Sequence, residues 1–164
     1  MSMDVNAADT DQLLKAAQQN NPNQIRDLVT LLGIPPSSGN GINQTALHVA
    51  AIWGHVESIQ ILIELGANVN AQNSLMGSTP LHSALGSAHA SPQQQSTIVD
   101  LLLEAGANPG VEDRGGNCPV EYIASNHPHK AILRQKLKPP PRNVQDQLMN
   151  NLLGGVMPTC RPAP

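Results

Sequence analysis

Six histidines and two cysteines are the residues of this sequence whose chemistry could serve a metal site or a nucleophile. His48 and His82 each follow a Thr-x-Leu tripeptide, whereas His127 and His129 lie close together near the end of the chain. A metal ion in a protein needs a compact set of three or four His, Cys, Asp or Glu ligands. No cysteine or carboxylate pair accompanies His127 and His129, so we expect no metal site.

The cysteines and glycines do not indicate an active site either. Cys118 and Cys160 are too few for a disulfide framework or a tetrahedral zinc site, and this cysteine usage favours a reducing, intracellular setting, cytoplasmic or nuclear. No base stands at a determinable distance from Cys118, so the sequence supports no nucleophile there. The glycines follow a long repeat period and not a phosphate-binding pattern. We predict no catalytic residues, no cofactor and no enzyme activity.

Composition and charge exclude several further classes. The chain has 164 residues, 40% of them hydrophobic, which is enough for a packed core. No apolar run approaches the ~18 residues that span a membrane, and residues 1–10 lack the basic and apolar regions of a secretory signal. Residues 1–113 carry ten acids and two bases, and the seven bases that follow are sparse and have few aromatic neighbours. We therefore expect neither a membrane nor a nucleic-acid partner.

The elements that position these residues are set by an internal repeat. The segment Thr45–Ala51 recurs 34 residues later as Thr79–Leu85. Ile59–Asn68 recurs after 40 residues as Val99–Asn108, which is the same period plus a six-residue insertion, and a fourth copy starts at Asp113. The predicted units are 9–39, 40–73, 74–112 and 113–137.

Each unit has the signals of two short helices joined by a tight corner. Thr45 and Thr79 stand where a hydroxyl can cap a helix, and Pro80 and Pro119 suit the first helical position. In the second unit we predict helices over about 46–53 and 56–65, separated by Gly54-His55. Gly66, and Gly106 one unit later, supply left-handed residues that end the second helices. One such pair cannot bury its apolar face alone, so the units must stack.

These residues give the chain a specific resemblance to ankyrin-repeat proteins. It is carried by Thr79-Pro80-Leu81-His82, by Ala50–His55 and by the Gly-Ala-Asn ends at 66–68 and 106–108. The resemblance implies an all-α solenoid of about four helix-turn-helix repeats with β-turn fingers. It also implies that His48 and His82 orient the fingers through hydrogen bonds to the backbone, and that polar outer faces cap the terminal units.

Two segments depart from the repeat. Ser87–Gln95 contains the insertion of the third unit, and its Ser, Pro and Gln content predicts a flexible surface loop. Residues 138–164 form a Pro-rich tail in which Val144, Leu148 and Leu152 mark a short amphipathic segment. This segment is too short to be a stable helix alone. It docks on the last repeat, binds a partner's groove or stays disordered, and the sequence leaves these alternatives open.

The resemblance also places a binding surface on the fingers and the first helices. The positions that should point outward there are Ile42, Gln44, Ile52, Trp53, Gln72, Leu75, Met76, Ser78, Glu112, Arg114 and Asn117. Five of them are large apolar residues, and exposed apolar clusters often mark interaction sites. We predict that Trp53 anchors a partner protein with Met76 and Leu75 beside it. The alternative is that the long finger 33–41 folds over Trp53 and buries it.

The expected function is therefore non-catalytic binding of another protein by a monomer, as an adaptor, scaffold or inhibitor. The alternative is a regulatory subunit of an enzyme complex, or a fragment of a larger multi-domain protein. The initial Met1 and the Pro-rich end favour a complete short chain. The fold by itself does not name the partner.

Overall fold

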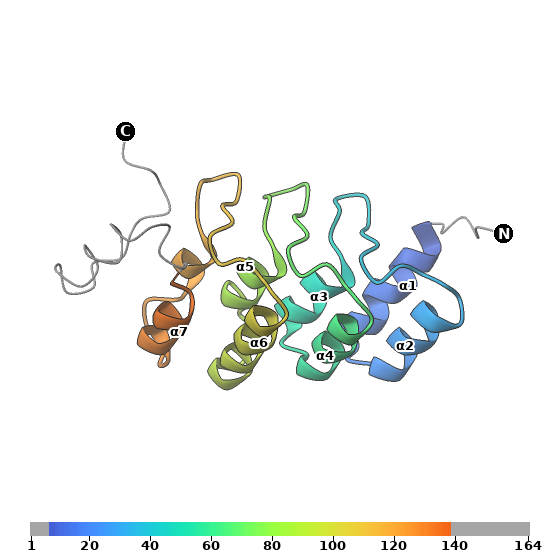
Figure 1. Ribbon diagram of the computed structural model, residues 1–164, viewed down its shortest axis with the longest axis horizontal. Coiled ribbons are helices and arrows are strands. Elements are labelled where there is room, and N and C mark those ends of the chain that lie inside the picture. Colours follow the sequence, from blue (N-terminus) through green and yellow to red (C-terminus); the bar gives the residue numbers. More distant parts are fainter. Residues whose placement is uncertain (1–6, 139–164) are drawn as a thin grey trace.

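Helix pairs stacked in a row form the body of the molecule in the computed structural model, which describes residues 7–138 (Figure 1). In chain order the elements are α1 (Ala7–Gln18), α2 (Pro22–Thr30), α3 (Ala46–Trp53), α4 (Val56–Glu64), α5 (Pro80–Leu85), α6 (Pro92–Glu104), the 3-10 helix η1 (Pro119–Tyr122) and α7 (Lys130–Lys136). The described residues contain no β-strand, only an isolated antiparallel bridge between Gly39 and Thr45. The all-α repeat solenoid predicted from the sequence is therefore confirmed.

The helices form two rows. In the inner row, α3 packs against both α1 and α5, and α5 packs against η1. In the outer row, α4 packs against α2 and α6. Each predicted unit holds one pair, although α1 begins before the predicted boundary at residue 9. The segments between successive pairs extend from one side of the stack as fingers, and they line up along it (Figure 1).

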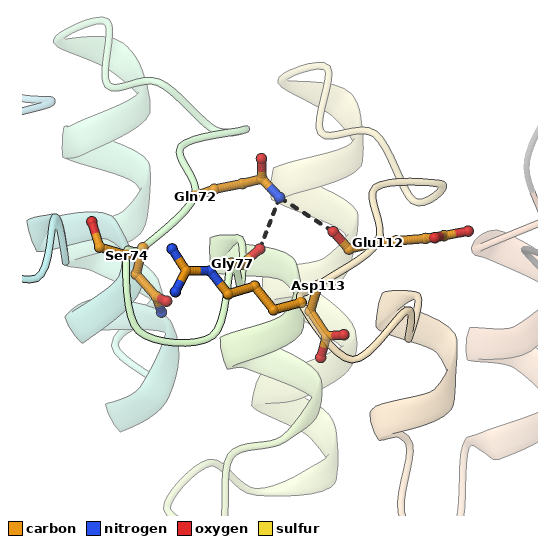
Figure 2. A pocket seen from close by; sticks show the side chains of 7 residues that line it. Gln72, Ser74, Gly77, Glu112 and Asp113 are labelled. Carbon is orange, nitrogen blue, oxygen red and sulfur yellow. Dashed lines mark hydrogen bonds between the residues drawn. The ribbon is translucent and has the colours of Figure 1, made fainter.

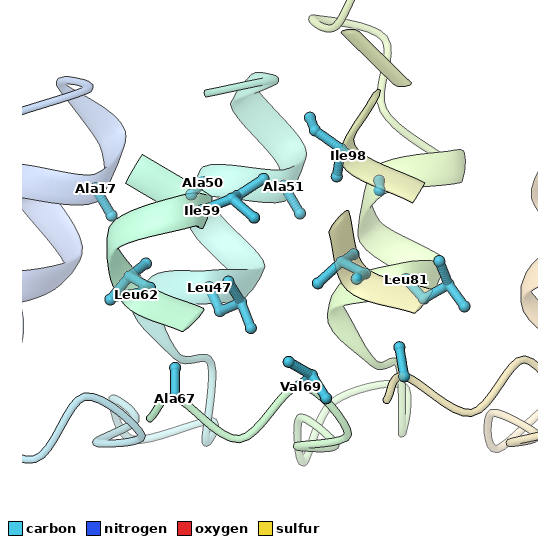
Figure 3. Close-up of a cluster of buried hydrophobic side chains, with 14 of the residues drawn as sticks. Ala17, Leu47, Ala50, Ala51, Ile59, Leu62, Ala67, Val69, Leu81 and Ile98 are labelled. Atoms are coloured by element: carbon cyan, nitrogen blue, oxygen red, sulfur yellow. The ribbon is translucent and has the colours of Figure 1, made fainter. Parts of the chain in front are cut away.

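The core lies between the rows and is made of small and medium aliphatic side chains. Leu47, Ile59, Leu62 and Leu81 are completely buried, and fully burying such a side chain contributes roughly 1.5–3 kcal/mol (Figure 3). Alanines such as Ala50 are also completely buried, and their small side chains allow neighbouring helices to approach closely. A core without phenylalanine therefore depends on close helix packing.

Local signals set the helix ends as the sequence predicts. Thr45 and Thr79 have extended backbones and form capping boxes with the residues three positions later. Pro80 is the first residue of α5. Gly66 and Gly106 follow their helices with φ of +84° and +91°, a region that favours glycine.

The predicted loop over Ser87–Gln95 is wrong in its second half. Ser91 caps α6, which starts at Pro92, and Ser91 and Gln94 form a capping box. Gln95 is buried, and its side-chain amide donates to the Ser87 carbonyl at 2.9 Å. The insertion thus lengthens a helix and leaves only a short, anchored loop.

The fourth unit is a shortened repeat. Its first helix is the single 3-10 turn η1, and its second helix, α7, is also short. The predicted tail lies outside the described residues except for Lys138, so the alternatives for residues 139–164 stay predictions.

Candidate functional site

The fingers are held in shape by an Asn or Asp side chain near the start of each. The Asn40 side-chain oxygen accepts from the backbone N–H groups of Ile42 and Gln44 at 3.1 and 3.0 Å. The Asn73 oxygen accepts from Met76 N–H at 2.8 Å. Short polar side chains of this kind favour turns because they satisfy the backbone locally. The sequence analysis missed this signal.

His48 ties the second unit to the finger that follows it, residues 71–79. Its Nδ1 accepts from the Thr45 backbone N–H at 3.2 Å and also lies 2.9 Å from the Thr45 hydroxyl. Its Nε2 lies 2.9 Å from the carbonyl oxygen of Ser78. Since Nδ1 accepts, the proton of the neutral ring is on Nε2, which donates to Ser78. Burial lowers the pKa of His48, and the hydrogen bond to Ser78 opposes this only in part.

His82 repeats this arrangement one unit further on. Its Nδ1 accepts from Thr79 N–H at 3.1 Å, and its Nε2 lies 3.1 Å from the Asn117 carbonyl oxygen. Burial lowers the pKa of His82 as well. The bonds to Ser78 and Asn117 are of the kind that the resemblance implied for His48 and His82.

A buried carboxylate organises the last finger. Asp113 accepts from the Gly115 and Asn117 backbone N–H groups at 2.8 and 2.9 Å, and from the Tyr122 hydroxyl at 2.6 Å. Burial alone would raise the pKa of Asp113, but these bonds and one from the Asn117 side chain outweigh it and lower the pKa to about 2. The bond to Asp113 and burial raise the pKa of Tyr122.

Hydrogen bonds also join each finger to the next. Ser74 N–H donates to the Ile42 carbonyl at 2.7 Å, and Arg114 N–H donates to the Met76 carbonyl at 2.8 Å. The Gln72 side-chain amide donates to the carbonyls of Gly77 and Glu112 at 2.9 and 3.2 Å (Figure 2). We call the three joined segments, residues 39–45, 71–79 and 109–118, the finger row.

Apolar side chains project from this row into solvent. Ile42 is 39% exposed, Leu75 62% and Met76 51%. They occupy adjacent fingers, because Ser74 is bonded to Ile42 and directly precedes Leu75. The structure therefore brings these three predicted binding residues together.

Trp53 lies elsewhere. It is the last residue of α3, about 12 Å along the helix from the finger that precedes it. Its ring stacks on His89 with the centroids 4.4 Å apart, and 38% of the side chain remains exposed. The partial cover comes from the loop after α5 and not from the finger 33–41. The structure thus separates Trp53 from Met76 and Leu75, with which it was predicted to form one binding site. Ile52, which is half-buried, precedes Trp53 at the end of α3.

The remaining predicted binding positions have mixed outcomes. Ser78 is 9% exposed and its carbonyl accepts from His48, so its prediction as an outward position is wrong. Its place directly before the capping threonine draws it into the base of the finger. Gln44, Gln72 and Asn117 all make hydrogen bonds within the finger row. Glu112 and Arg114 are exposed.

A polar cleft of about 350 Å³ opens between the second and third segments of the finger row (Figure 2). It is lined by Gln72, Asn73, Ser74, Gly77, Glu112, Asp113 and Arg114. Asp113, the buried acidic residue of this set, already accepts hydrogen bonds from Tyr122, Gly115 and Asn117. The cleft therefore offers hydrogen-bonding groups and charge, but no pair of groups arranged as nucleophile and base.

Two further findings concern only the described part of the chain. Between residues 7 and 138, no group of three or more His, Cys, Asp or Glu side chains is placed to hold a metal ion. Over the same residues, no helix has the length and apolar character needed to cross a membrane.

The stacked helix pairs and the joined fingers define a helical repeat protein. A family model described as ankyrin repeats, in three copies, matches residues 13–113. The chain belongs to the ankyrin-repeat family, as the resemblance in its sequence indicated.

The relatives are ankyrin-repeat proteins of very different lengths. Rabankyrin-5 of Mus musculus is 40% identical over 101 residues, which cover 57% of this chain and 8% of that protein. An ankyrin repeat-containing protein of Saccharomyces cerevisiae is 27% identical over 124 residues, covering 70% of this chain and 68% of its own length. ARF GTPase-activating protein GIT2 of Mus musculus is 35% identical over 88 residues, covering 54% of this chain and 12% of that protein. The chain thus spans less than one tenth of Rabankyrin-5.

Proposed function

We propose that this chain binds a partner protein without catalysis, as an adaptor, scaffold or inhibitor, and that the finger row is the contact surface. The observation that carries the proposal is the exposure of Ile42, Leu75 and Met76 on adjacent fingers. Large apolar side chains gathered on a surface and surrounded by polar groups are typical of interaction sites. Membership of the ankyrin-repeat family, whose fold is a protein–protein interaction module, supports this function.

The hydrogen bonding of the finger row supports the same proposal. Asn40 and Asn73 fix the turns, and backbone bonds join each finger to its neighbour. A surface that is already ordered loses little conformational entropy when a partner binds. The row therefore suits recognition of one defined shape.

The test compares two pairs of exposed apolar residues. Leu75→Ser with Met76→Ser removes the apolar surface of the finger row. Leu31→Ser with Leu32→Ser removes two leucines that are 76% and 53% exposed and lie outside the fingers. Because all four residues are exposed, we expect the free energy of unfolding of both double variants to lie within about 1 kcal/mol of the wild-type value.

Partners of the full chain are captured from lysate and quantified by mass spectrometry. Proteins that bind the wild-type chain and the Leu31/Leu32 variant, but not the Leu75/Met76 variant, support the finger row as the contact surface. The proposal fails if the Leu75/Met76 variant keeps the same partners.

A second candidate function is regulation of an enzyme, as a subunit of its complex or as one region of a larger protein. It is favoured by the comparison with ARF GTPase-activating protein GIT2, a much longer protein named for an activity on a GTPase. Co-purification separates the candidates. One stable enzyme complex favours the regulatory role, whereas several unrelated partners favour an adaptor. The monomeric state expected from the sequence stays a prediction.

A further inference from the structure

The finger row carries an exposed cation that no described acidic group neutralises. Its segments 39–45 and 71–79 contain no charged residue, whereas the segment 109–118 contains Glu112, Asp113 and Arg114. Within residues 7–138 the two ion pairs are Arg26–Glu64 and Lys136–Asp100, so the Arg114 guanidinium takes part in neither.

Neither acidic neighbour of Arg114 forms an ion pair with it. Asp113 is buried and is bonded to Tyr122 and to the backbone of its own finger. The Glu112 side chain points away from Gln72, on the opposite side from Ser74 (Figure 2). Arg114 is therefore the cationic residue in the lining of the cleft, and its guanidinium is left to meet an anionic group of a partner.

Arg114 also lies directly beside the apolar residues of that finger. Its backbone N–H is bonded to the Met76 carbonyl at 2.8 Å. A Cβ built on Gly77 would lie 3.3 Å from Arg114 Cγ, so the aliphatic stem of the arginine rests against the glycine. The missing side chain at Gly77 thus lets the arginine approach Met76 closely.

We propose that the finger row binds an extended acidic-apolar peptide segment, with a carboxylate on Arg114 and an apolar side chain on Leu75 and Met76. Packed helices such as α3 and α5 lie about 8–10 Å apart, and the fingers attached to them repeat at the same interval. An extended chain covers that distance in about three residues. In the bound peptide, the acidic residue on Arg114 is therefore about three positions from the apolar residue on Leu75 and Met76. A second apolar residue of the peptide, about three positions further along, contacts Ile42.

This inference rests on the proposed function and names the chemistry of its partner. It is tested with a random 12-residue peptide library displayed on phage and panned against the immobilised full chain. We expect enrichment of Asp or Glu about three positions from a Leu, Ile, Met, Val or Phe. Selected peptides are then synthesised and their binding is measured by fluorescence anisotropy.

Arg114→Gln removes the charge, and we expect it to weaken binding of these peptides about tenfold, the size of one charge-assisted contact. Arg26→Gln is the matched control, because it removes the same charge from an arginine already paired with Glu64. It should leave binding unchanged. Panning against Arg114→Glu should shift the enriched residue from acidic to Lys or Arg. Melting curves of all three variants should match the wild-type curve, since both arginine side chains are exposed.

The outcomes separate the two proposals. Enriched peptides without an acidic preference, or peptides that bind Arg114→Gln as tightly as the wild type, overturn the inference and leave the binding function standing. If binding is lost equally in Arg114→Gln and Arg26→Gln, the inference is also overturned. If the wild-type chain enriches no peptide while folded, the inference fails and the proposed binding function is judged by the capture experiment alone.

Discussion

The ring of His48 joins two backbone segments that are distant in sequence, and His82 does the same one repeat later. In each ring Nδ1 accepts a backbone N–H from the capping threonine, and Nε2 donates to a carbonyl of the next finger. Protonation would add a hydrogen to Nδ1, where it would face the threonine N–H. The charged ring can still donate from Nε2 to the finger, but it loses the bond that Nδ1 accepts from the threonine N–H.

This arrangement predicts loss of stability in mild acid. The pKa values of His48 and His82 are lowered in the folded chain, chiefly by burial, from an unfolded value near 6.5. Between the lowered values and about pH 6.5 the unfolded chain binds more protons, so the free energy of unfolding falls as the pH falls. We expect full stability above about pH 6.5 and a progressively lower melting temperature below it.

The titration can be measured on each ring by NMR. The imidazole C–H signals of His48 and His82 should titrate below those of the urea-unfolded chain, which supplies the reference. Titration of either ring in the folded chain at the same pH as in the unfolded chain would contradict the prediction.

At this scale the sequence predicts residues whose role follows from the repeat, and it fails where the role depends on neighbours outside the repeat. The helix cap at Thr45 is predicted from the residues themselves, whereas the role of His48 follows from the resemblance to the ankyrin repeat. Ser78 is mispredicted because its position is variable in sequence but its carbonyl is needed by His48. Trp53 is covered by His89, a residue of the insertion, for which a repeat pattern gives no register.

The loop 86–91 of the third unit contacts the end of α3 in the second unit. The Ser87 hydroxyl donates to the Ile52 carbonyl, and His89 stacks on Trp53. The loop comes so close to Gly54 that a Cβ on that glycine would lie 2.8 Å from the Cβ of Ala90. The glycine at the end of α3 is thus required both for its backbone angle and for this contact.

Two glycine substitutions separate these requirements. Gly54 and Gly66 both have left-handed backbones, with φ of +75° and +84°, but no atom lies within 4 Å of a Cβ on Gly66. Gly66→Ala should cost about 1–2 kcal/mol of unfolding free energy, for the backbone strain alone. Gly54→Ala should cost about 1–3 kcal/mol more, for overpacking against the loop.

Urea unfolding followed by circular dichroism measures both costs. Ala90→Gly in the Gly54→Ala background should restore part of the second cost, because it removes the Cβ contact at 2.8 Å but leaves Ala90 Cα at 2.9 Å. Equal losses for Gly54→Ala and Gly66→Ala would show that the loop does not press on α3.

Elements are predicted well where caps and breaks are coded locally. The predicted helix over 46–53 coincides with α3, and the predicted helix over 56–65 ends one residue beyond α4. The start of α6 was missed although Ser91-Pro92-Gln93-Gln94 is a capping-box pattern. There the polar composition of the insertion favoured a loop, while the buried contact of Gln95 with Ser87 depends on the tertiary structure.

The bonds of His48 and His82 run in one direction along the array, from the unit of each histidine to the finger that follows it. In the fourth unit Glu121 takes the histidine position, and its carboxylate accepts from Cys118 N–H at 2.7 Å. Glutamate thus keeps the capping half of the role. A carboxylate has no N–H with which to reach a further finger. This substitution suits a terminal unit.

A directional array with nearest-neighbour contacts predicts that the two histidine links fail differently. His82→Ala should loosen mainly the fourth unit, because among the described elements η1 of that unit packs against α5 of the third and a lost buried hydrogen bond costs about 1–3 kcal/mol. His48→Ala weakens a central interface, so it should destabilise the units on both sides of it. Hydrogen exchange read by mass spectrometry distinguishes these cases: His82→Ala should speed exchange over residues 119–136 and leave 46–64 protected, whereas His48→Ala should speed both. Uniformly faster exchange in His82→Ala would mean that the chain unfolds as one unit, with the terminal repeat bound as firmly as the centre.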